Sequence, residues 1–225
     1  MLANKFFLLW LWIISFILIL LAYLFLDRSI SSFIYAHHWR ECLSNSFGLE
    51  KIVEWPPVLE AISPVLFFVL LFFSKSKSKL QKMLLLMTLS VMLTYLLKND
   101  LKWIFSRDWP ETWRHHNFSW ISNQAYGFQW FQGGFFKGDD ATGSFPSGHS
   151  SIAFASLLAV GLYYRRGLWF CLLLASLEGF SMVAFDYHFL SDVIAGACLG
   201  MTVTILCDRI FYPSLRKTSA FMPGM

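Results

Sequence analysis

The chain has 225 residues, of which 56% are hydrophobic and only 14% are charged. Soluble domains average roughly 45–50% apolar and about 25% charged residues, so this composition excludes an ordinary soluble domain and indicates a membrane protein. The net charge of +4 is small and arises from basic residues that anchor helix ends, so no nucleic-acid partner is implied.

Six apolar segments are candidates for crossing a bilayer. A spanning helix needs about 20 mostly apolar residues, because the hydrocarbon core is about 30 Å thick. The first segment is too long for the apolar core of a cleavable signal peptide, so we expect it to be retained. The sequence predicts an all-α, polytopic membrane protein with six transmembrane helices and a single domain over residues 1–225. The spans are Phe6–Leu26, Pro57–Phe73, Met83–Phe105, Ser150–Tyr164, Leu168–Tyr187 and Phe189–Phe211.

The basic residues indicate how these helices are oriented. Loops rich in Lys and Arg stay on the cytoplasmic side of a membrane. If the N-terminus is cytoplasmic, the loops on that side carry ten of the 18 basic residues: Lys5, Lys75, Lys77, Lys79, Lys82, Arg165, Arg166, Arg209, Arg216 and Lys217. Both termini are then expected in the cytoplasm. We expect the protein in a bacterial inner membrane, with the opposite helix ends facing the periplasm.

A first polar cluster lies where the third predicted span ends. It contains Lys98, Asn99, Asp100, Lys102 and Arg107. Several cations at one helix end can hold a phosphate, and arginine offers a bidentate fork for its oxygens. The alternative is that the two lysines only extend their ammonium groups to the membrane interface. Taken alone, this cluster favours the alternative.

A second cluster, Pro146-Ser147-Gly148-His149, directly precedes an apolar run. Pro, Ser and Gly at a helix start leave free backbone N–H groups, which form an anion site. Gly148 permits close approach of an oxyanion, Ser147 can donate its hydroxyl, and His149 can deliver a proton to a leaving oxygen. The segment therefore predicts an anion site with a proton donor beside it.

A third cluster contains His188 and Asp192, whose spacing of four residues predicts that both lie on one helix face. A carboxylate there orients the imidazole, and a neutral, oriented imidazole is a competent nucleophile toward phosphorus. Such a pair can equally form a structural hydrogen bond. All three clusters fall at the same membrane face in the predicted topology, which favours an active site.

These residues resemble the type 2 phosphatidic acid phosphatase superfamily over about residues 98–192. The family pattern is Lys, six residues, Arg-Pro; then Pro-Ser-Gly-His; then Ser-Arg, five residues, His-x-x-x-Asp. The second motif is complete here, and the third retains Ser181, His188 and Asp192. The resemblance implies that His188 is a nucleophile forming a phosphohistidine, Asp192 its orienting partner and His149 the general acid. Ser147, Gly148 and Lys102 would bind phosphate.

Two arginines of the family pattern are replaced in this chain. Trp109, followed by Pro110, stands at the first position, within a Trp-Pro-Glu-Thr-Trp variant of the first motif, and Met182 stands at the second. Either the enzyme binds anions weakly, or other cations supply the charge. We favour the second interpretation, with Arg107 as the substitute and Lys98 and Arg114 as weaker candidates.

The sequence thus predicts a metal-independent lipid phosphatase that needs no cofactor. Its substrate is expected to be a membrane lipid phosphate such as undecaprenyl diphosphate, phosphatidylglycerol phosphate, phosphatidate or a lipid A phosphate. One alternative is a phosphotransferase that uses the same site. Another is a non-catalytic lipid-binding or transport relative, which the intact His149, His188 and Asp192 argue against. The sequence carries no signal for an oligomeric state.

Overall fold

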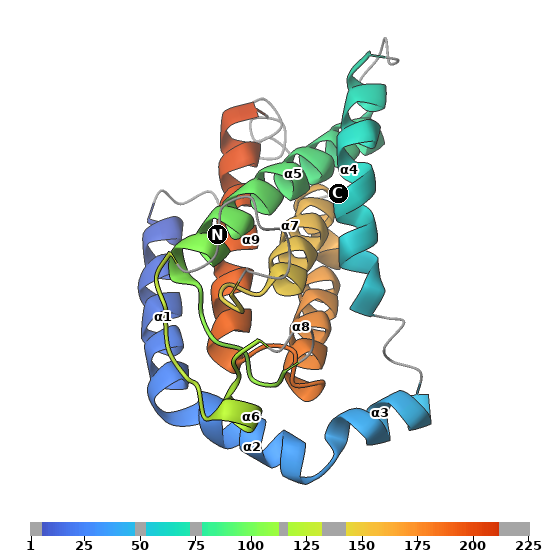
Figure 1. Ribbon diagram of the computed structural model, residues 1–225. Coiled ribbons are helices and arrows are strands. Elements are labelled where there is room, and N and C mark those ends of the chain that lie inside the picture. The colour runs from blue at the N-terminus through green and yellow to red at the C-terminus, as the bar shows by residue number, and fades with distance from the viewer. Residues whose placement is uncertain (1–5, 48–52, 73–77, 113–116, 132–142, 212–225) are drawn as a thin grey trace.

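The computed structural model describes residues 6–47, 53–72, 78–112, 117–131 and 143–211. All regular elements within these residues are helices, as expected for the predicted all-α class. Helix α7 (Gly148–Tyr163) lies inside the bundle and packs most extensively against α5 (Lys79–Phe105), α8 (Leu168–Ala184) and α9 (Leu190–Phe211) (Figure 1). Most residues of α7 are buried, so it is the central element.

The N-terminal helix is longer than predicted. Helix α1 (Phe7–Leu21) continues through a π-helical turn, η1 (Ala22–Leu26), into α2 (Asp27–Ala36). Together they form one apolar helix of 30 residues, whereas the predicted span ended at Leu26. The helix continues because Asp27, which reads as the start of a polar loop, is buried against partners from distant parts of the chain.

Two further helices complete the bundle and its edge. Helix α4 (Trp55–Phe72) packs against α5, and α1 packs against α9. Helix α3 (Trp39–Phe47) follows α2 and extends away from the bundle (Figure 1). The short helix α6 (Trp120–Asn123) and the turn η4 (Arg165–Gly167) lie within connecting segments.

Five helices of the described chain are long and apolar enough to cross a membrane. The sixth predicted span corresponds to α7, a shorter apolar helix of 16 residues. Helix α8 ends at Ala184, three residues before the predicted end. A turn follows it and leads to His188. The predicted number of crossings and the location of the termini stay predictions.

The outer surface of the bundle is covered by large apolar side chains. Trp169 is 75% exposed and Phe16 is 66% exposed, which would be unfavourable for a protein surrounded by water. In a bilayer such side chains contact lipid tails at no cost. The protein is therefore a membrane protein whose polar groups are gathered inside.

Two glycines let α9 lie directly against the start of α7. A Cβ atom on Gly196 would stand 2.5 Å from the carbonyl oxygen of Ser147, and one on Gly200 would stand 2.2 Å from that of Ser151. Small residues spaced by four along a helix are the usual means of close packing between membrane helices. Because Ser147 and Asp192 both lie at this contact, the two glycines determine how closely these two polar residues approach each other.

Candidate active site

His188 lies in the short connection between α8 and α9 rather than on a helix. Helix α9 begins at Leu190, so the prediction that His188 and Asp192 share a helix face is wrong in its detail. The two side chains still meet, with His188 Nδ1 3.7 Å from Asp192 Oδ2. The backbone N–H of Phe189 donates to the same Oδ2 at 3.1 Å, which holds the carboxylate under the ring.

Asp192 is fully buried and is bonded to Arg107 on its other oxygen. Arg107 Nη1 donates to Asp192 Oδ1 and, at 2.6 Å, to the hydroxyl of Ser191. Arg107 Nη2 donates to Asp27 at 2.8 Å. Both terminal nitrogens of this arginine are thus occupied by groups of the protein, and its side chain has no exposed surface.

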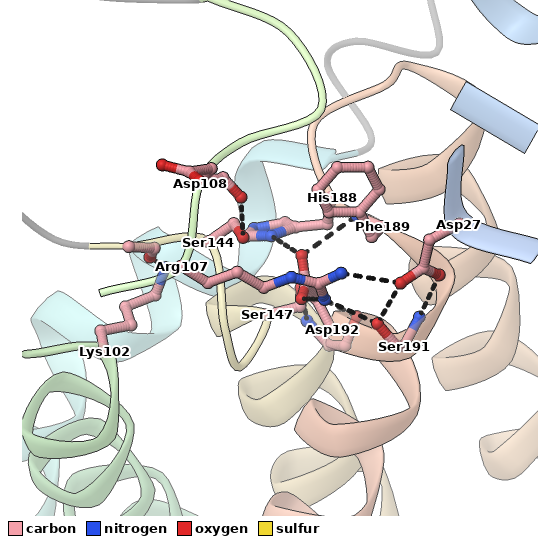
Figure 2. Close-up of polar contacts among 12 residues, drawn as sticks. Asp27, Lys102, Arg107, Asp108, Ser144, Ser147, His188, Phe189, Ser191 and Asp192 are labelled. Atoms are coloured by element: carbon pink, nitrogen blue, oxygen red, sulfur yellow. Dashed lines mark hydrogen bonds and ion pairs between the residues drawn. The ribbon is translucent and has the colours of Figure 1, made fainter. Parts of the chain in front are cut away.

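Asp27, at the start of α2, is the second carboxylate of this cluster (Figure 2). Its Oδ1 accepts the backbone N–H of Ser191 at 3.0 Å, and its Oδ2 accepts the hydroxyls of Ser191 and Tyr126. A carboxylate that is removed from water is stable only when paired and hydrogen-bonded. Asp27 satisfies both conditions, and it joins the N-terminal helix to the base of the site.

The start of α7 forms the opposite wall. Ser147 caps the helix, and its hydroxyl accepts the N–H of Ser150. The backbone N–H of Ser147 donates to the carbonyl oxygen of Asp192 at 3.0 Å, which fixes α7 to α9. The N–H groups of Gly148 and His149 precede the first intrahelical bonds of α7, so this helix end can bind an anion. His149 interacts electrostatically with His188, Lys98 and Lys102.

Lys102 and Trp109 stand beside the imidazole of His188. Lys102 Nζ donates to the carbonyl oxygen of Gly143 at 2.8 Å and lies 5.0 Å from the centre of the Trp109 ring. The rings of Trp109 and His188 are 5.3 Å apart and tilted by 35°. The residue that replaces the expected arginine therefore packs against both the cation and the imidazole.

Lys98 approaches the same region from α5. Its Nζ forms an ion pair with Glu60 of α4 at 2.7 Å and would lie 3.2 Å from a Cβ atom at Gly148. An ammonium group so close to the start of α7 can contact an anion bound there. Lys98 thus lies at the site, although its pairing with Glu60 was not expected.

Burial and neighbouring charges determine the protonation states of His188 and Arg107. Burial lowers the pKa of His188 below its ordinary value, and the nearby Asp192 opposes this effect only in part. The imidazole is therefore neutral, the form that a nucleophile requires. Burial alone would lower the pKa of Arg107, but Asp192 and Asp27 outweigh it and keep the guanidinium charged.

The structure brings together most of the residues predicted for the site: Lys98, Lys102, Arg107, Ser147, Gly148, His149, His188 and Asp192. Arg107 reaches the site from behind Asp192, bonded to carboxylates. Met182 lies in an apolar cluster with Ile34, Val183, Phe185 and Val193. Arg114 lies outside the described residues.

Two acidic residues at the site, Asp27 and Glu60, were not predicted from the sequence. Asp27 follows an apolar run and Glu60 lies within the second predicted span. Ionisable residues in or beside membrane helices usually have a functional partner, and that signal was present for both. Their partners lie 80 residues away for Asp27 with Arg107, and 38 for Glu60 with Lys98, so spacing gave no guide.

Comparison with known families confirms the resemblance to the superfamily. The profile of the PAP2 superfamily matches residues 83–216, more than half of the chain. The chain belongs to the PAP2 superfamily. Lipid phosphate phosphatase 1 of Arabidopsis thaliana is 38% identical over 86 residues, which cover 32% of this chain and 26% of that protein. Lipid phosphate phosphatase 2 of the same plant is 38% identical over 85 residues, covering 31% and 29%.

The PAP2 fold is also found in a solved structure. The crystal structure of a transmembrane PAP2 type phosphatidylglycerolphosphate phosphatase from Bacillus subtilis aligns with a TM-score of 0.53 and 18% identity, covering 97% of this chain and 100% of that one. This similarity shows a shared fold. The curated relatives are matched over less than a third of their length, and Asp27 and Glu60 lie outside the matched PAP2 region.

Proposed function

We propose that this PAP2 protein is a lipid phosphatase that hydrolyses a phosphomonoester or diphosphate on a membrane lipid through a phosphohistidine on His188. The observation that carries the proposal is the position of His188. Its buried, neutral imidazole has Nδ1 3.7 Å from Asp192 Oδ2, lies beside the N-terminal end of α7 and is flanked by Lys102. The nucleophile His188, the N-terminal end of α7 and the cation Lys102 therefore lie around the position where the phosphate would bind.

The first step of the proposed reaction forms a nitrogen–phosphorus bond. Nδ1 of His188 faces Asp192, so the lone pair of Nε2 attacks phosphorus. Asp192 stabilises the positive charge that the imidazole acquires. The N–H groups of Gly148 and His149, with Lys102, bind the phosphoryl oxygens, on which negative charge increases in the transition state. The bond between phosphorus and the lipid oxygen breaks.

His149 completes this step and begins the next one. In its protonated form, His149 gives a proton to the leaving lipid oxygen and becomes neutral. It then takes a proton from a water molecule, whose oxygen attacks the phosphohistidine and releases inorganic phosphate. His188 returns to its neutral form and His149 is again protonated. No divalent cation takes part in either step.

The direction of the bundle supports an active site on the periplasmic side of a bacterial inner membrane. Helix α5 starts at Lys79 and ends at the site, and α7 starts at the site and ends beside Arg165 and Arg166 (Figure 1). The basic residues at these two positions thus lie at the far end of the bundle. By the positive-inside rule that end is cytoplasmic.

The test is phosphate release by the purified protein in detergent. Phosphatidylglycerol phosphate, phosphatidate, undecaprenyl diphosphate and a lipid A phosphate would each be supplied, with and without chelator. We expect the wild type to release phosphate from at least one of them and His188→Ala to be inactive. His37→Ala, at an exposed histidine, is the matched control and should match the wild type.

Chemical trapping distinguishes the mechanism from the activity. Rapid acid-free quenching with a radiolabelled substrate should leave phosphate on His188 as an acid-labile, base-stable adduct, and a peptide map should locate it. Wild-type protein that releases phosphate without this adduct, or His188→Ala that remains active, would refute the phosphohistidine. Lipid binding without turnover would instead support a non-catalytic relative.

A further inference from the structure

The most heavily bonded charged group near the site is one that phosphate chemistry does not require. The carboxylate of Asp27 has no exposed surface and takes part in one ion pair and several hydrogen bonds. Three of its partners, Arg107, Ser191 and Tyr126, come from different segments of the chain. Arg107 in turn contacts Asp192, and Asp192 contacts His188 (Figure 2).

We propose that Asp27 is a positioning residue, which acts through Arg107 and Ser191 to fix the orientation and the effective charge of Asp192 and thereby the nucleophile His188. The inference rests on the proposed function, because it assigns a role in the same reaction. It also assigns Arg107 to the support of Asp192 rather than to the phosphate, and makes the N-terminal helix part of the catalytic machinery.

Charge balance explains why one arginine needs two carboxylates. Arg107 paired with Asp192 alone would form a neutral pair, which would attract the positive charge of a phosphorylated imidazole only weakly. With Asp27 also ionised, the cluster of Asp27, Arg107 and Asp192 carries a net charge of −1. Asp27 shares the guanidinium, so Asp192 keeps more of its negative charge for His188. Electrostatic effects of this kind are strong in a buried site.

Geometry provides a second link that does not depend on charge. Asp27 accepts both the backbone N–H and the hydroxyl of Ser191, which immediately precedes Asp192. The first turn of α9 is therefore held from the side of α2. Arg107 Nη1 bridges the Ser191 hydroxyl and Asp192 Oδ1, so the carboxylate cannot rotate without breaking this set of bonds.

Other titratable or charged groups also lie near His188 and influence the pH at which it is protonated. Asp192 contacts it from α9, Lys102 faces it from α5, and His149 faces it from α7. Lys98, also on α5, acts on His149. Tyr126 faces Arg107 and Asp27 from the outer segment. A substitution at Asp27 leaves Lys98, Lys102 and His149 in place, so a change in the pH profile would report the cluster of Asp27, Arg107 and Asp192.

The experiment compares Asp27→Asn, Arg107→Met and the double variant by pH-dependent kinetics on the lipid phosphate that the wild type hydrolyses best. Asp27→Asn brings the cluster to neutrality, so protonated His188 is less stable and the acidic limb of kcat/KM moves to lower pH. Arg107→Met leaves two unbalanced carboxylates, so the limb moves to higher pH. In the double variant the net charge is again −1, and the limb should return close to that of the wild type.

The steady-state constants give an independent readout. Since Arg107 is bonded to carboxylates, Arg107→Met should lower kcat by about tenfold or more, because positioning errors of about 1 Å cost about a hundredfold in rate. The KM and the inhibition constant of inorganic phosphate should change less than threefold. A phosphate-clamping arginine would show the reverse, with a large rise in both constants. That outcome would overturn the proposal.

One additional variant and two controls keep the test decisive if Arg107→Met does not yield folded protein. Ser191→Ala removes the hydrogen-bond link without changing charge, so kcat should fall while the acidic limb stays in place. Asp100→Asn and Arg166→Gln are controls that neutralise an exposed acidic and an exposed basic side chain. Both should match the wild type. The proposal fails if folded Asp27→Asn keeps wild-type kcat and pH profile. An inactive wild type would instead refute the proposed function.

Discussion

The close contact between α7 and α9 allows a quantitative test of how the site is built. Replacing Gly200 by Ala would place a Cβ atom 2.2 Å from the carbonyl oxygen of Ser151, whereas ordinary contact begins at 3.4 Å. The obstructing atom is backbone, so it cannot rotate away. The two helices must therefore separate by about 1 Å at this point.

That separation would act on both stability and catalysis. Overpacking of this size costs about 1–3 kcal/mol, which lowers the midpoint of thermal unfolding by roughly 2–10 °C for a chain of this length. Because Ser147 on α7 and Asp192 on α9 are joined across the same interface, the N-terminal end of α7 moves away from His188. A displacement of about 1 Å lowers kcat by about a hundredfold.

The assay measures phosphate release and thermal unfolding, followed by tryptophan fluorescence, on the same detergent preparation. Gly167→Ala is the matched control, because a Cβ atom there meets nothing within 4 Å. Gly196→Ala, with a contact of 2.5 Å nearer the site, should lose at least as much activity. Wild-type kcat and stability in Gly200→Ala would refute the idea that the glycines set the width of the site.

Three further predictions concern His188, Lys102 and Asp186. The acidic limb of kcat/KM should lie below the ordinary histidine pKa of about 6.5, because burial lowers the pKa of His188 and activity is lost only as pH falls through that value. Lys102→Met should raise KM for the lipid phosphate by about tenfold to a hundredfold, as loss of a charged hydrogen bond costs about 1.5–3 kcal/mol. Burial raises the pKa of Asp186 to about 7, so the folded state binds an extra proton between about pH 4 and pH 7 and loses stability as pH rises through this window. Asp186→Asn should remove that loss and raise the unfolding midpoint at pH 8, and asparagine also tolerates the left-handed backbone at this position (φ 56°).

Each of these predictions has a result that would contradict it. A limb above pH 7 would mean that another group, not a buried neutral His188, controls the rate. An unchanged KM in Lys102→Met, with kcat reduced, would place the lysine's role in the transition state alone. An unfolding midpoint for Asp186→Asn that falls with pH as steeply as in the wild type would show that a different residue accounts for the pH dependence.

The amino-acid sequence was sufficient to predict the fold class, the family and which residues gather around His188. Apolar length predicts helices because a bilayer offers the backbone no hydrogen-bond partners, so each span must satisfy its own. Ser147, Gly148 and His149 are predictable because the anion-binding helix end is a local structure, made by consecutive residues. His188 and Asp192 are close in sequence, so their contact was predicted even though helix α9 starts later than expected.

The roles of the arginine and of its partners depended on the tertiary structure. Arg107 is two residues from the position of the missing motif arginine, which made it an obvious candidate for phosphate binding. The fold instead places Asp27 and Asp192 against both of its terminal nitrogens. An ion pair between residues 80 positions apart depends on how α2 packs against α9, and no local pattern encodes that packing.

By itself, the sequence determined that the protein is helical, embedded in a membrane and equipped with His149, His188 and Asp192 at one end. These properties follow from composition and from residues close together in the chain. Only the tertiary structure showed that Asp27 and Glu60 belong to the site and that Trp109 packs on His188. The physical reason is that buried charges must be neutralised by whichever partners the packing of the helices brings within reach.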